Sequence, residues 1–263
     1  MSKTFAKAIA GLASALTCWQ RPMRQANTLL RVSNLLQRRH SVQTNAGPVH
    51  FLSTHPQALD YPSSLLTREP DTITWLDQLS ADSVLWDIGA NVGAYALYAA
   101  RRGATVWAFE PAPASFAALS ENVRINRLDD HISALPLAVA GKNGIDYLAM
   151  ASTNPGSVMH SVGAEAPFRQ SVLCVTVDDF IRSSGAPAPT HIKLDVDGIE
   201  PDILEGALAT LAAPSFQSLL VEMDAEDTPR NATIVAILGR AGLKLIQMGP
   251  ISHQSRNGIF ARA

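Results

Sequence analysis

The sequence predicts an α/β fold with a mostly parallel sheet and a ligand site at one edge of that sheet. The first observation is an unbroken apolar run, residues 84–86, that leads into Asp87; such a run is typical of a strand buried on both faces. The second observation is that two glycines, Gly89 and Gly93, follow this run and that a helix-forming segment begins directly after them. Gly103 stands where a left-handed cap of that helix is expected. The third observation is that strand-like and helical patterns alternate over most of the remaining chain, as in doubly wound sheets.

Local patterns predict the other elements in order. A helix is expected to start within residues 67–71, where an early proline and acidic residues favour a helix N-terminus. Residues 47–66, with three prolines, are expected to be irregular. Residues 146–150 and 172–177 are expected to form an antiparallel insertion around the polar loop 152–160. The remaining expected strands are residues 105–109, 131–140, 191–194, 218–221, 243–248 and 258–262. The remaining expected helices are residues 94–102, 113–126 and 231–241, together with one from Pro201 through Leu211.

The composition is ordinary for a soluble globular protein. The chain has 263 residues, of which 47% are hydrophobic and 17% charged, enough for one medium domain with an appendage. Its two cysteines, Cys18 and Cys174, form no disulfide framework and match no metal-ligand spacing. We therefore expect reduced thiols in a cytoplasmic protein.

The net charge of −2 is the sum of a basic N-terminal part and an acidic remainder of the chain. Residues 1–59 carry seven Lys and Arg and no acidic residue, whereas the remainder carries 14 basic and 23 acidic residues, or −9. We divide the chain into a basic, helical N-terminal arm, residues 1–45, and a main domain, residues 46–263. Such an imbalance suggests contact with a membrane, a nucleic acid or a partner.

Three interpretations of the arm are open. Its apolar stretch, residues 8–18, is too short to span a membrane but could be the core of a signal peptide. The acid-free, Arg-rich start also suits a transit peptide. The third interpretation is a pair of amphipathic helices, with leucines in residues 29–36, that pack on the body or touch a membrane peripherally.

Acidic residues mark the expected ligand site. Asp87, Glu110, Asp195 and Glu222 each stand at the carboxyl end of a predicted strand, where ligands bind to open α/β sheets. Glu110 lies at about the right distance after the glycine loop to hold a ribose diol.

The loop spacing indicates which nucleotide is bound. It is D-x-G-x-x-x-G, so it lacks the glycine of G-x-G-x-x-G that admits a pyrophosphate. Asp87 would repel a phosphate but attract the ammonium group of an amino-acid tail. A cationic amino acid joined to a ribose is S-adenosylmethionine, and we expect this cofactor rather than NAD.

Four sequence blocks carry a family resemblance: D-I-G-A-N-V-G-A-Y (87–95), F-E-P-A-P-A-S-F (109–116), L-S-E-N-V-R-I-N (119–126) and I-K-L-D-V-D-G-I-E (192–200). In this order they resemble the FkbM family of S-adenosylmethionine-dependent methyltransferases. R-E-P-D-T-I-T-W-L-D upstream and N-G-I-F near the end extend the resemblance over about residues 67–262. Where the family usually has Glu, this chain has Asp197. The resemblance implies a Rossmann-like class I methyltransferase fold, with a seven-stranded, mostly parallel sheet and an antiparallel last strand.

The resemblance also implies a reaction and a set of site residues. Such proteins commonly O-methylate sugar hydroxyls or natural-product hydroxyls, and we expect the acceptor here to be a hydroxyl of a sugar, a glycan or a related metabolite. An alcohol nucleophile gains from a base that removes its proton. Asp195 is the first candidate for that base, His160 in the inserted loop is the second, and Glu222 is the third. Two of them have an alternative role: Asp195 could hold only the cofactor, and His160 could be a surface residue. Lys193 is expected to pair with a carboxylate. The expected cofactor-binding residues are Asp87, Gly89, Asn91, Gly93, Glu110, Ala138 and Asp195.

Other functional classes are weaker. A nucleic-acid methyltransferase would suit the basic arm, but the N/D-P-P-Y type of motif is absent after the fourth strand, as is an aromatic platform for an extruded base. A non-catalytic nucleotide-binding scaffold is a further alternative, against which the intact loop and acids argue. Asp195, Asp197, Glu200 and Glu222 could together bind a hard cation, although we expect no metal dependence.

Overall fold

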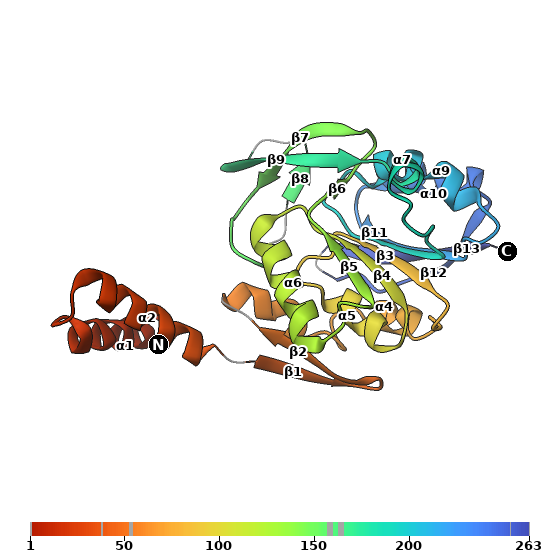
Figure 1. The fold of residues 1–263 in the computed structure, drawn as a ribbon. Helices are drawn as coiled ribbons and strands as arrows, with labels where there is room; N and C mark the ends of the chain where they lie inside the picture. Colours follow the sequence, from red (N-terminus) through yellow and green to blue (C-terminus); the bar gives the residue numbers. More distant parts are fainter. Residues whose placement is uncertain are drawn as a thin grey trace. The chain divides into compact units, whose positions relative to one another are not determined.

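The computed structural model describes residues 2–37, 39–52, 55–156, 160–162, 166–252 and 254–262. The chain divides into two compact units, residues 1–39 and 40–263, and each is described by itself. The first unit is a helical hairpin of α1 (Ser2–Thr17) and α2 (Pro22–Leu36), shown in red in Figure 1. Across the described residues, neither these helices nor any other has the length and apolar character needed to cross a membrane.

The second unit is built on a seven-stranded sheet of β3 (Val84–Ile88), β4 (Thr105–Phe109), β5 (Ile132–Leu135), β10 (His191–Leu194), β11 (Ser218–Asp224), β12 (Leu243–Met248) and β13 (Ser255–Arg262). The strand order is β12-β13-β11-β10-β3-β4-β5. The five strands from β11 to β5 are parallel, whereas β13 runs antiparallel to both of its neighbours. The predicted seven-stranded sheet with an antiparallel last strand is therefore confirmed.

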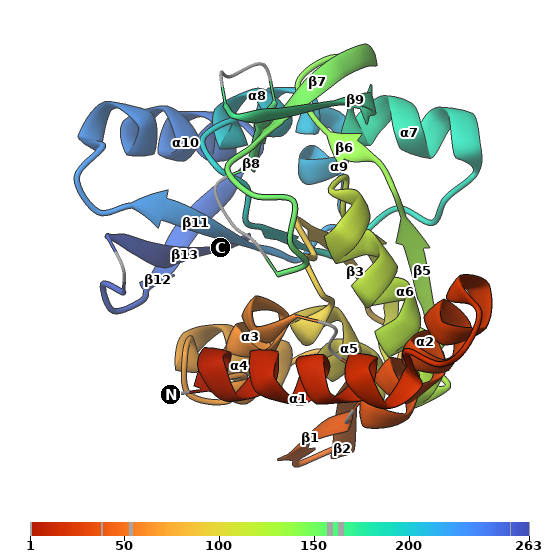
Figure 2. The same cartoon turned by 90° about the vertical axis from the view of Figure 1, so that its left-hand side faces the viewer.

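Helices cover both faces of this sheet (Figures 1 and 2). One layer consists of α4 (Pro70–Leu76), α5 (Ala94–Arg101) and α6 (Pro113–Asn126), and the other of α7 (Val177–Ser184), α8 (Glu200–Glu205), α9 (Leu208–Ala212) and α10 (Thr228–Arg240). Adjacent strand residues point to opposite layers: Leu85 packs in the first core and Trp86 in the second. The apolar run of β3 is thus buried on both faces, as predicted.

Two smaller sheets accompany the main one: the hairpin of β1 (Arg39–Thr44) and β2 (Gly47–Leu52), and a four-stranded sheet in the order β6 (Ala138–Val139), β9 (Phe168–Val175), β7 (Gly144–Met150) and β8 (His160–Val162). β7 runs antiparallel to β8 and β9, which confirms the predicted antiparallel insertion. Figure 2 shows this sheet beside the α7–α10 layer.

Several boundaries differ from the sequence prediction. The expected strand 131–140 is two strands in different sheets, β5 and β6, because proline at 136 cannot donate to a strand ladder. The expected strand 172–177 ends early, because Thr176 caps α7: its Oγ1 accepts a hydrogen bond from Asp179 N at 3.2 Å.

Two other segments were also mispredicted. Residues 47–66 contain β2 and the short helices η1 (Pro56–Leu59) and α3 (Asp60–Ser63), since the prolines are tolerated in an edge strand and at helix starts. The helix expected from Pro201 through Leu211 is interrupted between α8 and α9. At that break, a Cβ on Gly206 would lie only 3.1 Å from Thr176 Cβ, so the chain passes tightly against the start of α7.

Candidate active site

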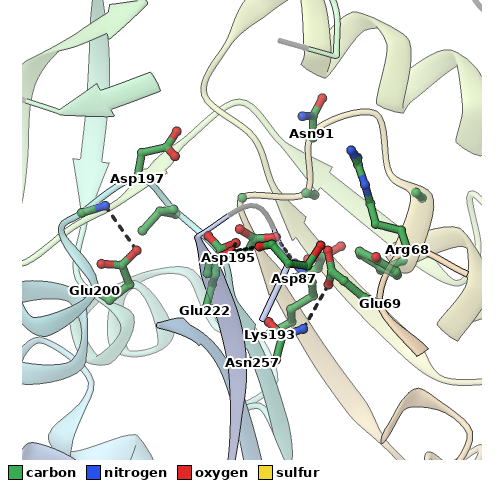
Figure 3. Close-up of a pocket in the computed structure, with 18 of the residues that line it drawn as sticks. Arg68, Glu69, Asp87, Asn91, Lys193, Asp195, Asp197, Glu200, Glu222 and Asn257 are labelled. Atoms are coloured by element: carbon green, nitrogen blue, oxygen red, sulfur yellow. Dashed lines mark hydrogen bonds and ion pairs between the residues drawn. The ribbon is translucent and has the colours of Figure 1, made fainter. Parts of the chain in front are cut away.

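A cavity of about 920 Å³ opens at the carboxyl ends of the central strands. Loops after β3, β4 and β10, the end of β11, the start of β13 and the segment before α4 all contribute to its wall. Figure 3 shows Asp87, Lys193 and Asp195 gathered in its centre, with Asp197 and Glu200 to one side of them. This is the edge at which the sequence predicts a ligand.

Asp87 lies at the centre of the cavity wall, in register with Lys193 of β10 and Ala108 of β4. Its side chain is buried, and its Oδ1 has no hydrogen-bond partner among the described residues. Burial raises the pKa of Asp87 to about 6, although the Lys193 charge acts in the opposite direction. A buried carboxylate with an unused oxygen is costly, so this oxygen is suited to a ligand that donates to it.

The glycine loop after β3 closes tightly against β4 and β10. Gly89 N and Ala90 N both donate to Phe109 O at 3.0 Å. Gly89 has φ +88°, and a Cβ there would lie 1.9 Å from the carbonyl oxygen of Asp195. Glycine is therefore required at this position for two reasons, the left-handed backbone and the close approach of β10.

Glu110 is fixed by the two loops that meet at the end of β4. Its Oε2 accepts a hydrogen bond from Asn91 N at 2.8 Å, and its Oε1 accepts one from Ala112 N at 2.7 Å. Burial raises the pKa of Glu110 to about 7, against the effect of these two bonds. Each carboxylate oxygen has a second lone pair, so Glu110 can accept a further bond from a diol.

Lys193 and Asp195 form an ion pair at the end of β10. Lys193 Nζ donates to Asp195 Oδ2 at 2.6 Å, and the lysine side chain is 2% exposed. Burial alone would lower the pKa of Lys193, but the charges of Asp195, Asp87 and Glu69 raise it above its usual value. The expectation that Lys193 pairs with a carboxylate is confirmed.

Glu222 lies beside this pair, inside β11 rather than at the end of that strand. Ser255 Oγ donates to Glu222 Oε1 at 2.5 Å. Burial, followed by the charge of Asp195, raises the pKa of Glu222 to about 8. Glu222 therefore holds its proton to higher pH than an ordinary glutamate, next to a carboxylate that is paired with a lysine.

A further wall of the cavity is formed by residues for which no sequence pattern predicts a role. It joins the segment before α4 to β13: Asn257 Nδ2 donates to Glu69 Oε2 at 3.2 Å and to Thr72 Oγ1 at 3.0 Å. Arg68, Asp71 and Arg256 line the same wall. These residues lie in or next to the segments R-E-P-D and N-G-I-F, whose resemblance to the family could have marked them as functional. The two segments are far apart in the sequence, however, so nothing in the sequence predicted that they meet in one wall.

The model of the methyltransferase FkbM domain matches residues 87–244, more than half of the chain. The chain belongs to the FkbM methyltransferase family. This confirms the resemblance and the prediction of an enzyme of the methyltransferase class.

Two relatives of this FkbM methyltransferase have named activities. Hexuronic acid methyltransferase AglP of Haloferax volcanii is 30% identical over 169 residues, which cover 64% of this chain and 67% of that protein. 31-O-demethyl-FK506 methyltransferase FkbM of Streptomyces tacrolimicus is 23% identical over 205 residues, covering 66% of this chain and 78% of that protein.

A crystal structure of methyltransferase FkbM from Methylobacillus flagellatus is similar in fold, with a TM-score of 0.51 at 18% identity. The similarity covers 79% of this chain but only 48% of the other, so this FkbM methyltransferase spans about half the length of that structure. It supports the Rossmann-like fold of the class.

Most of the predicted site residues line the cavity of this FkbM methyltransferase: Asp87, Gly89, Asn91, Glu110, Asp195 and Glu222. Gly93 instead packs under the loop, where a Cβ would lie 2.4 Å from Leu119 Cδ1. Ala138 is buried in an apolar cluster with Cys174 and is not among the described residues that line the cavity. The backbone of His160 pairs with Met150 in the inserted sheet, but its side chain lies outside the part of the chain that the structure describes.

The residues of the hard-cation interpretation form no assembled ligand set in the part of the chain that the structure describes. Glu200 is buried and accepts a hydrogen bond from Gly198 N at 3.2 Å, and burial raises its pKa. Arg230 Nε lies 3.9 Å from Glu200 Oε2. Within the described residues, no group of three or more His, Cys, Asp or Glu is arranged to hold a metal ion.

Proposed function

We propose that this FkbM methyltransferase takes its methyl group from S-adenosylmethionine and transfers it to a hydroxyl of a sugar, a glycan or a related metabolite in the cytoplasm. The main support is the pair of buried carboxyls, Asp87 and Glu110, which stand at the ends of adjacent strands on either side of one glycine loop. The relative that methylates hexuronic acid supports a sugar acceptor.

The residues present fit the proposed cofactor. Asp87 Oδ1, buried and without a partner among the described residues, suits the ammonium of a methionine tail. Glu110 has acceptor capacity for two ribose hydroxyls, and Gly89 of the glycine loop lines the same cavity. When bound, S-adenosylmethionine would supply a methyl group on a positively charged sulfur. The cavity of about 920 Å³ lies at the upper end of the range for ligand sites, which suits two ligands bound together.

The protein's own contribution would be alignment and proton removal. Holding the acceptor oxygen in line supplies much of the acceleration of such a displacement. Lys193 fixes the orientation of Asp195, so the Asp195 carboxylate is the proposed group that accepts the hydroxyl proton. Glu222, with its raised pKa and its bond from Ser255, would relay or hold a second proton beside it.

Calorimetric titration tests the cofactor assignment. We expect the purified chain to bind S-adenosylmethionine and not NAD, and we expect Glu110→Gln to weaken that binding strongly. Glu226→Gln is the matched control, because Glu226 is an exposed acid away from the cavity lining. Binding of NAD alone, or equal affinity of Glu110→Gln and the wild-type chain, would overturn the assignment.

Acceptor screening tests the rest of the proposal. The purified chain should methylate hexuronic acids or glycans that contain them, with S-adenosylmethionine as methyl donor and product detected by mass spectrometry. Methylation of RNA or DNA but of no carbohydrate would favour the nucleic-acid alternative. Cofactor binding without turnover on any acceptor would favour the scaffold alternative.

A further inference from the structure

The helical hairpin α1–α2 carries an apolar stripe that its own fold leaves uncovered. Phe5, Ile9, Leu12 and Leu16 recur at intervals of four, three and four residues, so they share one face of α1. All four are exposed, from 47% for Ile9 to 70% for Phe5. Trp19, in the turn that follows, is 80% exposed. Exposed aromatic and aliphatic side chains in one row indicate a surface that binds something apolar.

Hydrogen bonds join α2 to α1 and to the turn between them. Gln25 Nε2 donates to Ser14 O at 3.0 Å, and Thr28 Oγ1 donates to Gln20 Oε1 at 2.9 Å. α2 has no buried residue. A helical pair in water usually buries its apolar faces against each other. In this hairpin a hydrogen bond joins the two helices, and Leu12, Leu16, Leu30, Leu35 and Leu36 are exposed.

The hairpin is also strongly basic. Residues 1–39 contain seven Lys and Arg and no acidic residue, so no cation of this unit can be neutralised within it. Three arginines, Arg21, Arg24 and Arg31, line a cleft of about 460 Å³ together with Trp19. Arg24 and Arg31 are seven residues apart, two helical turns, and so lie on the same side of α2. Guanidinium groups in such a row suit phosphate groups, which they can bind through two parallel hydrogen bonds.

We propose that α1–α2 attaches the enzyme to the surface of an anionic lipid membrane. The apolar stripe would enter the boundary between head groups and acyl chains, and the arginine cleft would bind lipid phosphates. A second copy of the hairpin would bring like charges together, and a soluble acidic partner would leave the apolar stripe in water. An anionic bilayer matches both features, the apolar stripe and the positive charge. Because neither helix is long enough to cross a membrane, the attachment is peripheral.

Vesicle flotation with the full-length chain tests this proposal. We expect at least about tenfold stronger binding to phosphatidylcholine vesicles with roughly 30% phosphatidylglycerol than to phosphatidylcholine alone. High salt should weaken the binding, because it screens the charges. Of the four tryptophans, Trp19 is 80% exposed, Trp107 is half-buried, and Trp75 and Trp86 are buried. A blue shift of tryptophan emission on binding that is absent from a Trp19→Leu variant would report insertion of the turn.

Matched variants locate the contact. Arg21→Gln with Arg24→Gln, and separately Phe5→Ser with Leu12→Ser, should each reduce vesicle binding about tenfold. The controls are Arg182→Gln with Arg240→Gln, and Ile145→Ser, which change exposed residues of the other unit and should bind as the wild-type chain does.

Two outcomes would overturn the proposal. One is the absence of binding to anionic vesicles, or equal binding by the hairpin variants. The other is that the hairpin variants change the melting temperature of the main domain but leave vesicle binding unchanged. That result would mean that the arm binds to the acidic main domain of its own chain.

Discussion

Lys193 Nζ lies 2.6 Å from Asp195 Oδ2, and this contact joins two side chains that leave the end of β10 on the same side. The lysine is almost fully buried and also lies over the Tyr95 ring, 5.0 Å from its centroid. It is surrounded by the charges of Asp195, Asp87 and Glu69. One buried cation therefore balances the acidic centre of the cavity.

Removal of this cation should be costly. We expect Lys193→Met to lower the free energy of unfolding by roughly 3 kcal/mol, because it leaves buried carboxylates without their partner. The control is Lys142→Met, which removes an exposed pair with Asp146 at 3.5 Å and should cost at most about 1 kcal/mol. Urea unfolding of the three proteins measures both values. Equal losses for the two variants would show that the Lys193 charge is not needed for stability.

Asp195→Asn separates catalysis from cofactor binding. If Asp195 accepts the proton of the acceptor hydroxyl, turnover should fall roughly a hundredfold or more, while affinity for S-adenosylmethionine changes little. Single-turnover kinetics and calorimetry on the same preparation provide the two numbers. An equal loss in both would make Asp195 a cofactor ligand, the interpretation that the sequence leaves open.

Gly89→Ala tests the packing of the glycine loop. We expect a loss of roughly 3–4 kcal/mol in stability, since the added Cβ meets the Asp195 carbonyl as well as a strained backbone. Gly185→Ala is the control, because Gly185 also has a left-handed backbone, φ +70°, but no atom within 4 Å of the added Cβ. It should lose only about 1 kcal/mol. Similar losses in both variants would mean that the close approach of β10 is not the reason for glycine at position 89.

Cofactor affinity should depend on pH through Asp87. Its pKa is raised to about 6, chiefly by burial, and a cationic ligand binds the ionised carboxyl. Binding below pH 6 must therefore release a proton, and affinity should rise about tenfold per pH unit up to that value and then level off. Calorimetry in buffers of different ionisation enthalpy measures the released proton. Asp87→Asn should bind weakly at every pH, without this rise.

Stability in the absence of ligand should change in the opposite direction. Asp87, Glu110 and Glu222 have pKa values raised to about 6, 7 and 8, so between about pH 4 and 8 the folded chain holds more protons than the unfolded chain. The free energy of unfolding should therefore fall as pH rises through this window. Urea unfolding of the ligand-free chain at pH 5 and pH 8 measures it. Greater stability at pH 8 would contradict the burial of these three carboxyls.

The sequence was sufficient for the elements whose patterns are local. β3, β4, α6 and β10 begin and end where the apolar runs, prolines and glycines indicate. It was insufficient where distant packing decides the conformation. The segment 131–140 is apolar enough to be predicted as one strand. In the structure it is divided between two sheets, because its second half, β6, pairs in parallel with β9.

The candidate site divides in the same way. By itself, the sequence determined that Asp87, Glu110 and Asp195 share one edge, because parallel strands bring their carboxyl ends together, and that the loop between them admits a ligand. Only the tertiary structure decided that Asn257 holds Glu69, 188 residues away, that Glu222 lies inside β11 next to Asp195, and that Lys193 is buried among three acids. Those contacts depend on how α4 and β13 pack against the sheet, and no local pattern encodes such long-range packing.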